Sequence, residues 1–258
     1  MGLSLINKII HKGKIKMKHI ILYSGGANSA YTAYLLNQKY HKDIILLHTP
    51  TYSEHPDADR FRKQFADYLN LPITVQADGR DIWQLMDDNK CLPSDRIPFC
   101  SRILKSEQAM KFYKLMSEDF IVYLGYDGTE WRRAQRTSAR LLYDDIKAEY
   151  PLIDGNISNQ YAKDYIRDTI KICLPQPYLY LSHNNCLPCF KGGKKHFYQV
   201  WKHYPKYFEK AEKAEKAEYN INHSVFRDKT LTELRKQWES QIPMFEDTED
   251  LRPCMCAL

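Results

Sequence analysis

Apolar positions in the first half of the chain occur in two alternating kinds of segment. Four short runs are almost continuously apolar and rich in β-branched or aromatic residues: 19–23, 43–48, 72–76 and 120–125. Three longer segments between them repeat apolar residues at helical spacing: 28–39, 57–70 and 101–116. Because buried strands of parallel sheets are apolar throughout and are joined by helices, this order predicts an α/β fold with a parallel, Rossmann-like sheet. We assign this unit to residues 17–155.

The second half of the chain has a mainly helical pattern. Helices are expected at 158–169, at 194–204 and at 205–220, where the triplet Glu-Lys-Ala occurs three times in succession. Glutamate and lysine on neighbouring turns stabilise an exposed helix, so the triplet segment is interpreted as a solvated arm. Thr230 and Glu233 form a capping box, which predicts a final helix after them. We assign residues 156–258 to a helical C-terminal region that carries a Cys-x-x-Cys and a Cys-x-Cys pair.

The composition indicates a protein with a substantial core and no membrane partner. At 258 residues and 43% hydrophobic content, the chain is long enough for one domain with an appendage. It has no apolar run of the roughly 20 residues that a membrane span requires, and its first residues lack the pattern of a signal peptide. We therefore expect a cytoplasmic protein, with residues 1–16 as a basic N-terminal extension before Met17. The sequence leaves the oligomeric state open, a homo-oligomer included.

The chain is mildly basic. Its net charge of +6, from 38 basic and 32 acidic residues, favours polyanionic partners such as nucleotides or nucleic acid. A lysine-rich solvated surface gives the same balance, so the charge alone does not identify the partner.

Residues 24–29, SGGANS, directly follow the first expected strand and lead at once into a helix. In such a turn the backbone N–H groups and the helix N-terminus converge on one point, which favours a bound phosphate. The spacing is neither that of a Walker P-loop nor that of a dinucleotide-binding turn. A plain strand-to-helix turn is the alternative. Residues 125–130 follow the fourth expected strand and would line the same crevice if the first and fourth strands are neighbours.

A basic block at 94–107 brings Arg96, Arg102 and Lys105 to the start of an expected helix. Cationic side chains and helix-terminal N–H groups suit an anionic substrate group or a triphosphate, although a solvated basic face has the same composition. Cys100 lies among these residues, and this setting favours a cysteine that acts as a thiolate ligand or nucleophile.

The seven cysteines are an odd number, which argues against a disulfide framework in a chain without a secretion signal. Cys186 and Cys189 form a Cys-x-x-Cys pair, whose two sulfur atoms can reach one metal ion. Two ligand sets compete: Cys254 and Cys256 complete a zinc site, or Cys100 joins the pair to hold an iron–sulfur cluster. A thioredoxin-like redox pair is a third alternative, but the pair lacks the βαβ context of that motif.

Several segments together resemble the phosphoadenosine phosphosulfate (PAPS) reductase family of the PP-loop, or N-type ATP pyrophosphatase, superfamily. They fall within residues 19–256 and read YSGGANS, DGR, RIPFCSRILK, VYLGYDGTEWRR, HNNCLPCFKGGKKHF, FRDKTLTELR and CMC. The similarity is greatest to an uncharacterised, often phage-borne branch with asparagine at position 28, where aspartate is common. The resemblance implies the adenine nucleotide α-hydrolase fold, with a five-stranded parallel sheet and a helical, cysteine-bearing C-terminal region.

The resemblance also implies a set of site residues. ATP or a related adenine nucleotide, with Mg²⁺, would be bound by the glycine turn and by residues after the fourth strand: Ser24, Gly25, Gly26, Asn28, Ser29, Gly125, Glu130 and Arg133. The side chains expected to take part in the chemistry are Lys105, Arg102, Asp127 and Arg132. An iron–sulfur cluster or zinc would be held by cysteines of the set Cys100, Cys186, Cys189, Cys254 and Cys256.

Three functions are compatible with these features. The leading hypothesis is an ATP pyrophosphatase that adenylates an acceptor and releases pyrophosphate, for sulfur transfer to a nucleotide or, by analogy with the superfamily's thiolation and phosphorothioation enzymes, to tRNA or DNA. The second is a PAPS or adenylylsulfate reductase with Cys254 or Cys256 as its nucleophile. The third is a nucleotide-sensing or nucleic-acid-binding module without catalysis, which the asparagine at position 28 keeps open.

Overall fold

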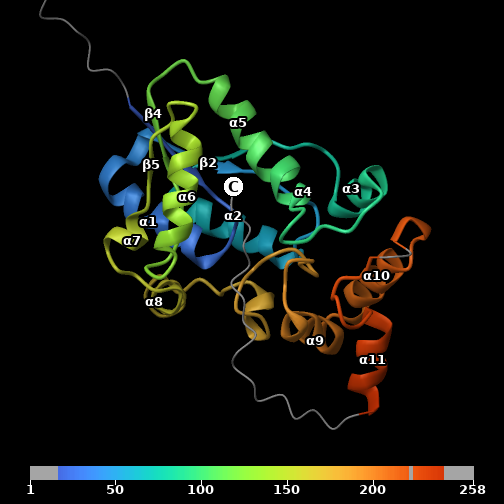
Figure 1. Ribbon diagram of the computed structural model, residues 1–258. Helices are drawn as coiled ribbons and strands as arrows, with labels where there is room; N and C mark the ends of the chain where they lie inside the picture. The colour runs from blue at the N-terminus through green and yellow to red at the C-terminus, as the bar shows by residue number, and fades with distance from the viewer. Residues whose placement is uncertain (1–16, 221–222, 241–258) are drawn as a thin grey trace, which may run out of the picture.

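The computed structural model describes residues 17–220 and 223–240. Its centre is a five-stranded, wholly parallel sheet with the strand order β3-β2-β1-β4-β5 (Figure 1). The strands are β1 Lys18–Leu22, β2 Ile44–His48, β3 Ile73–Val75, β4 Phe120–Tyr123 and β5 Ala148–Glu149. The predicted α/β fold with a five-stranded, Rossmann-like parallel sheet is confirmed.

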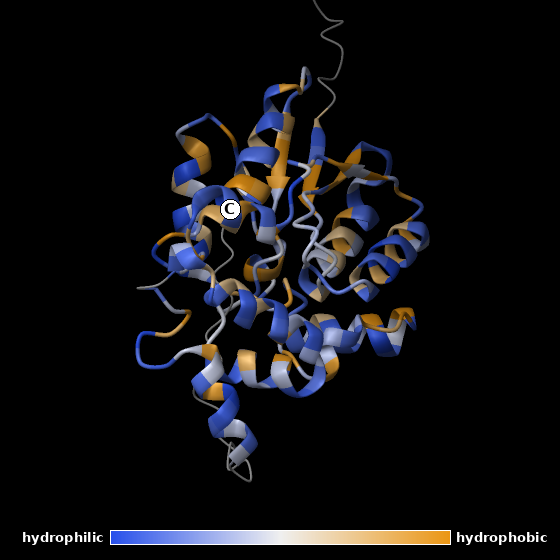
Figure 2. Cartoon of the chain, turned by 90° about the vertical axis from the view of Figure 1, so that its right-hand side faces the viewer, coloured by the Kyte–Doolittle hydropathy of each residue, from blue (hydrophilic) through white to orange (hydrophobic). Residues whose placement is uncertain are grey.

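Helices cover both faces of the sheet, because successive residues of its apolar strands point to opposite sides. Ile21 packs on one face with buried residues of the helices that include Ala162. Ile20 packs on the other with Ala109 and Ala134. The covering helices are α1 Ala27–Tyr40, α2 Asp57–Leu69, α7 Pro151–Asp154 and α8 Asn159–Asp164 on the first face, and α5 Glu107–Lys114 and α6 Trp131–Leu142 on the second. The strands accordingly stand out as hydrophobic segments in Figure 2.

The strand order reverses beside β1. β2 pairs with β1 on one side, whereas β4 pairs with it on the other, with Val122 opposite Ile20. The first and fourth strands are therefore neighbours, which is the condition that the sequence set for a shared crevice. Their carboxyl ends bring residues 24–29 and 124–130 to the same edge of the sheet.

The tripeptide DGR, residues 78–80, leads into a helix that the sequence pattern did not predict, α3 Ile82–Asn89. A capping box begins it: the backbone N–H of Gln84 donates to Asp81 Oδ1 at 2.8 Å, and the backbone N–H of Asp81 donates to Gln84 Oε1 at 2.9 Å. α6 was also not expected, because four of its 12 residues are arginine and its buried face consists of Ala134, Thr137 and Leu141.

The helix expected at 101–116 is divided into three parts. They are α4 Phe99–Ser101, the π-helical turn η3 Arg102–Ser106 and α5. A π-turn widens the helix by one residue and is frequent at functional sites. It directs Lys105 toward the carboxyl ends of the strands, while Leu104 and Ser106 are buried.

After α8, η4 Tyr165–Ile170 packs on the first face of the sheet through Ile166, and η5 Gln176–Leu179 follows it. A second hydrophobic core is built by α9 Lys194–His203, α10 Pro205–Glu215 and α11 Leu231–Ser240. The remaining short helices are η2 His41–Asp43, before β2, and η6 Glu218–Asn220, after α10. Leu85 of α3 and Leu104 of η3 pack into the second core with Phe197, Phe208 and Leu231. The C-terminal helices are thereby held against the segment that connects β3 with α5 (Figure 1).

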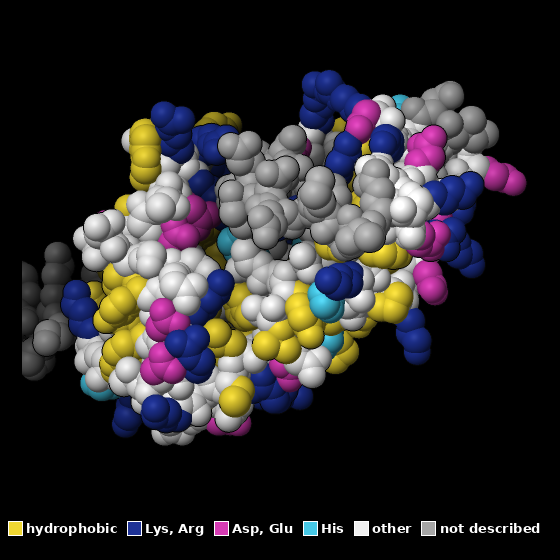
Figure 3. Space-filling model, turned by 90° about the horizontal axis from the view of Figure 1, so that it is seen from below, with side chains coloured by type: hydrophobic (Ala, Val, Ile, Leu, Met, Phe, Trp, Pro, Cys, Tyr) yellow, Lys and Arg dark blue, Asp and Glu magenta, His cyan; other side chains and the backbone are white. Residues whose placement is uncertain are grey.

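α10, the helix of the Glu-Lys-Ala triplets, is not the solvated arm that the sequence predicted. Phe208 and Ala211 are buried, and the buried carboxylate of Glu215 accepts hydrogen bonds from the backbone N–H groups of Leu231 at 2.6 Å and Val225 at 2.8 Å. The prediction was wrong because alanine at every third position leaves a small surface against which α9 and α11 can pack. Basic and acidic side chains are interspersed on the face seen from below in Figure 3.

The final helix begins as predicted. The backbone N–H of Glu233 donates to Thr230 Oγ1 at 3.2 Å, and the backbone N–H of Thr230 donates to Glu233 Oε2 at 2.8 Å. No helix in the described part of the chain is long and apolar enough to cross a bilayer. The predicted extension at 1–16 and the tail cysteines Cys254 and Cys256 lie outside the described residues.

Candidate functional site

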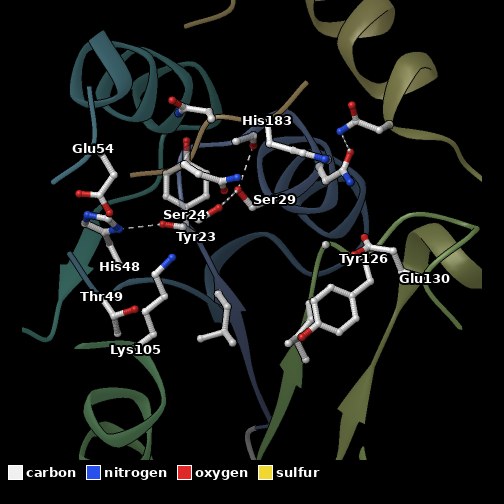
Figure 4. A pocket seen from close by; sticks show the side chains of 18 of the residues that line it. Tyr23, Ser24, Ser29, His48, Thr49, Glu54, Lys105, Tyr126, Glu130 and His183 are labelled. Atoms are coloured by element: carbon white, nitrogen blue, oxygen red, sulfur yellow. Dashed lines mark hydrogen bonds between the residues drawn. The ribbon is translucent and has the colours of Figure 1, made fainter. Parts of the chain in front are cut away.

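A cleft lies beyond the carboxyl ends of β1 and β4, at the point where the strand order reverses (Figure 4). Its wall on the β1 side is the glycine turn. Gly25 has a φ of +83°, and a Cβ atom there would come within 2.8 Å of Arg62. Arg62 in turn donates from Nη1 to the carbonyl of Ser24 at 2.7 Å. The turn therefore requires glycine at this position, since both the backbone conformation and the space exclude a side chain.

Hydrogen bonds of Ser24 and Ser29 connect the turn with the start of α1. Ser29 Oγ donates to the carbonyl of Gly26 at 2.9 Å and lies 3.2 Å from Ser24 Oγ (Figure 4). No acidic residue lies in the first turn of α1. The positive end of the helix dipole thus lies at the cleft without a carboxylate in the first turn of the same helix, which suits an anion.

The β4 side of the cleft is in direct backbone contact with the turn. A Cβ atom on Gly125 would come within 2.8 Å of the carbonyl of Asn28 and the backbone nitrogen of Ser29. Glycine at 125 is what allows the two loops to approach so closely. Asn28 Oδ1 accepts a hydrogen bond from Asn159 Nδ2 at 2.8 Å, so α8 fixes the side chain that replaces the more common aspartate.

Residues of the C-terminal region close the cleft over the turn. The hydroxyl of Tyr178 accepts a hydrogen bond from the backbone N–H of Ala27 at 2.9 Å, and the backbone N–H of Asn184 is a second donor to it. Asn184 Nδ2 donates to the carbonyl of Gly25 at 2.9 Å. Asn184 Oδ1 is buried and has no hydrogen-bond partner among the described residues. This oxygen therefore offers an acceptor to a ligand that carries an N–H or O–H group.

Charged side chains enter the cleft from two sides. Lys105 lies with Glu54 and His48 on one side, and Glu130 lies on the other, where it pairs with Arg133 (Figure 4). Burial raises the pKa of Glu54, but the nearby Lys105 ammonium and a hydrogen bond from the Thr51 side chain, with smaller effects of Arg62 and His48, outweigh it and hold the pKa below its ordinary value. Glu54 is therefore ionised at neutral pH.

Two histidines in the cleft are neutral at pH 7. Burial, with a smaller contribution from Arg62, lowers the pKa of His48 to about 4, and its Nδ1 donates to the carbonyl of Tyr23 at 3.1 Å. Burial and then Lys163 lower the pKa of His183. Neither imidazole adds a cation to the site, so Lys105 and Arg133 are the cationic side chains that line the cleft among the described residues.

Most of the predicted nucleotide-binding residues lie where the sequence placed them. The cleft is lined by Ser24, Gly26, Asn28, Ser29, Lys105, Gly125, Glu130 and Arg133, and Gly25 supports the turn from behind. Three residues predicted to take part in the chemistry lie outside its lining. Arg102 is 61% exposed and pairs with Glu107 at 2.7 Å, Asp127 accepts from the backbone N–H of Thr129 at 2.9 Å, and Arg132 lies over the ring of Trp131.

The cysteines of the predicted metal site lie beside the cleft. Cys186 is buried, its Sγ lies 3.1 Å from Thr51 Oγ1, and its backbone pairs with that of Glu54. The backbone N–H of Cys189 donates to His196 Nε2 at 2.9 Å. Among the residues that the structure describes, no three histidine, cysteine, aspartate or glutamate side chains are grouped closely enough to hold a metal ion. These residues do not by themselves form a complete site for zinc or for an iron–sulfur cluster.

Sequence reasoning missed several residues of the cleft. They are His48, Thr49, Glu54, Asn159 and Tyr178, together with His183, Asn184 and Asn185. For His48 and Glu54 a signal existed, because they stand at the carboxyl end of the second expected strand. For Tyr178 and Asn159 there was none, since their positions depend on how the C-terminal region folds back.

Comparisons with known proteins give two similarities. No protein-family model matches the chain. It is 29% identical to an uncharacterised nin region protein of Escherichia phage lambda in an alignment of 101 positions. The alignment covers 34% of this chain and 34% of the other, so the match spans about a third of that relative. It is also similar in structure to a U34-tRNA thiolase from Methanococcus maripaludis, solved with its 4Fe–4S cluster, at 13% identity and a TM-score of 0.48, over 95% of this chain and 82% of that one. Membership of the PAPS reductase family stays a prediction.

Proposed function

We propose that this protein is an ATP-using enzyme that adenylates an acceptor with release of pyrophosphate, for sulfur transfer to nucleic acid. The observation that carries the proposal is the cleft at the strand reversal, where residues of the glycine turn, Lys105 and Arg133 line one space. Backbone dipoles and two cations held by different elements suit a polyphosphate whose charge increases as it leaves.

In the proposed reaction an acceptor oxygen attacks the α-phosphorus of ATP. The bond between that phosphorus and the oxygen bridging to the β-phosphate breaks, and pyrophosphate leaves with the electron pair. The acceptor carbon carries the adenylyl-activated oxygen until a sulfide-level sulfur donor attacks that carbon and AMP departs. Lys105 and Arg133 stabilise the pyrophosphate, and the Asn184 Oδ1 acceptor orients the nucleotide or the acceptor.

Sulfur chemistry is supported by the position of Cys186. Its thiol is 3.1 Å from Thr51 Oγ1, and its backbone pairs with that of Glu54, whose side chain lines the cleft. A sulfur atom bound at the Cys-x-x-Cys pair would thus lie next to the nucleotide. Completing a metal site there requires cysteines beyond this pair: Cys254 and Cys256 are the predicted candidates for zinc, and Cys100 is the predicted candidate for an iron–sulfur cluster. Mg²⁺ bound with ATP takes most of its ligands from phosphates and water, so one carboxylate, Glu130, suffices on the protein side.

The experiment that tests the proposal measures pyrophosphate released from ATP and Mg²⁺ in the presence of total cellular RNA. Wild type should release it, and Lys105→Met should lower the rate by about 100-fold, the usual effect of removing one group that stabilises the transition-state charge. Lys114→Met removes an exposed lysine of α5 and should leave the rate unchanged. If the protein binds ATP but releases no pyrophosphate with any RNA or nucleotide supplied, the proposal is rejected in favour of a nucleotide sensor. If it releases sulfite from PAPS, it is a reductase.

A further inference from the structure

Helix α6 carries a row of arginines on its exposed side. Its sequence WRRAQRTSARLL contains four arginines and no acidic residue. Arg132, Arg136 and Arg140 are exposed and follow one another at intervals of four residues, while Ala134, Thr137 and Leu141 face the core. Residues at this spacing lie one above the other along a helix, about 6 Å apart. The three guanidinium groups therefore form one stripe, about 12 Å long.

The stripe has no acidic counterpart on the protein. Within residues 17–220 and 223–240, the arginine of α6 that makes an ion pair is Arg133, with Glu130, whereas Arg132, Arg136 and Arg140 make none. Arg136 instead donates from Nε to the carbonyl of Arg132 at 3.4 Å. Like charges at this spacing destabilise a helix, and cations in its first turn oppose the helix dipole. A surface that contacts only water does not require this destabilising arrangement of charges.

Two other helices pair charges three or four residues apart. In α2, Arg60 pairs with Asp57, and Lys216, directly after α10, pairs with Glu212. The face seen from below also intersperses both signs (Figure 3). A row of unpaired cations at intervals of four residues is therefore not the general arrangement of charge on the described surface.

The stripe starts at the mouth of the candidate site. α6 follows the loop after β4, of which Tyr126 and Glu130 line the cleft (Figure 4). Arg133, in the first turn of α6, also lines it. Trp131 stands at this end, 48% exposed, with the Arg132 guanidinium 5.1 Å from its ring centroid. An exposed indole and a stacked guanidinium are surfaces on which an unpaired base can stack.

We infer that the α6 stripe, Arg132, Arg136 and Arg140 with Trp131, binds single-stranded nucleic acid: the arginines contact successive phosphates and Trp131 stacks on a base next to the cleft. The row of cations is about 12 Å long, as estimated from the helix rise. Its charge is complementary to that of a polyanion. The exposed indole at the mouth of the cleft selects one with accessible bases. The inference rests on the proposed function, for which it supplies the surface that holds the acceptor.

The test measures binding of a fluorescein-labelled single-stranded RNA of mixed sequence to the full-length protein by fluorescence anisotropy at several salt concentrations. Arg136→Gln with Arg140→Gln removes two phosphate contacts. The slope of log K against log salt should become smaller in magnitude by about 1.4, and the affinity at low salt should fall about tenfold. Lys206→Gln with Lys213→Gln makes the same charge change on the exposed side of α10 and should change neither quantity.

A second variant tests the stacking residue. Trp131→Ala should weaken RNA binding about tenfold with an unchanged salt slope, because stacking is not electrostatic. The inference is overturned if the arginine pair leaves the affinity and slope at wild-type values, if the lysine pair causes the same loss, or if duplex RNA of the same sequence binds more tightly. ATP binding is measured on the same samples and should be unchanged in the arginine pair. A wild type that binds RNA through the stripe but never cleaves ATP would reject the proposed function and keep this inference.

Discussion

The backbone N–H of Ala27, the first residue of α1, donates a 2.9 Å hydrogen bond to the hydroxyl of Tyr178, 151 residues later in the chain. The C-terminal region therefore supplies a hydrogen-bond acceptor to the N-terminus of α1, which forms one wall of the candidate site. Since the hydroxyl also accepts from the N–H of Asn184, its own proton is left to donate to another group. Burial raises the pKa of Tyr178 to about 12, so this proton is present at neutral pH.

Replacing this hydroxyl should destabilise the protein. Tyr178→Phe leaves two backbone N–H groups without their acceptor, which costs about 1–3 kcal/mol of unfolding free energy. Urea unfolding followed by circular dichroism measures the change. Tyr180→Phe is the matched control, because Tyr180 is 46% exposed and stacks on His203. An unchanged urea midpoint for Tyr178→Phe would show that the contact with Ala27 contributes nothing.

The contact between the two loops should tolerate no side chain at position 125. In Gly125→Ala the new Cβ would meet backbone atoms of Asn28 and Ser29 at 2.8 Å, and backbone cannot rotate away as a side chain can. We expect a loss of about 1–3 kcal/mol of stability and a markedly weaker affinity for ATP. Thermal unfolding and calorimetric titration with ATP measure the two effects. Wild-type affinity in this variant would mean that the nucleotide does not contact the turn.

Replacing Asn28 by aspartate should change how ATP affinity depends on Mg²⁺ and leave the stability of the fold unchanged. An aspartate at this position keeps an acceptor for Asn159 Nδ2, so Asn28→Asp should unfold at the same temperature as wild type. Its added negative charge faces the cleft and repels phosphate unless a cation intervenes. ATP affinity should therefore fall about tenfold in the presence of EDTA and recover with Mg²⁺, one charge of this kind being worth on the order of 1 kcal/mol. Equal affinities in EDTA would contradict this placement of the side chain.

Acid should weaken the attachment of the Cys-x-x-Cys turn. Burial lowers the pKa of His196 to about 4, and its Nε2 must be unprotonated to accept from Cys189 N–H. Between pH 6.5 and 4 the unfolded chain binds a proton at this imidazole that the folded chain does not, so stability falls as the pH falls through this window. The contribution is up to about 3 kcal/mol.

Melting temperatures between pH 7 and 4.5 measure this effect. His196→Gln removes the titrating group, so its melting temperature should fall less over the range than that of wild type. His41→Gln changes an exposed histidine and should follow the wild-type curve. Parallel curves for wild type and His196→Gln would show that the acid sensitivity arises elsewhere, for instance at His48.

The local pattern was sufficient to predict four of the five strands and the turn. Those four strands appear as short apolar runs, whereas β5 consists of Ala148 and Glu149 alone. Gly25 is required by its own backbone conformation and by the proximity of Arg62, so this signal is also contained in a short segment. The pairing of β4 with β1 was a condition of the sequence interpretation and was not predicted by it.

The remainder of the site depends on contacts between distant segments. Tyr178 meets Ala27, and Asn159 meets Asn28, only because the chain folds back over the sheet after β5. No short-range pattern encodes this return. The α6 stripe was not recognised for a different reason. Arg132 was predicted to take part in the chemistry and Arg133 to bind the nucleotide, whereas helical geometry directs Arg133 into the cleft and leaves Arg132 exposed beside Arg136 and Arg140.

The nature of the products formed from ATP labelled with ³²P at the α-phosphate tests the account most directly. With Mg²⁺ and RNA, wild type should form labelled AMP, with unlabelled pyrophosphate as the second product, because the turn, Lys105 and Arg133 are placed to stabilise a leaving pyrophosphate. Gly125→Ala should form little of either. Labelled ADP as the product would place the cleaved bond between the β- and γ-phosphates and contradict the proposed adenylation.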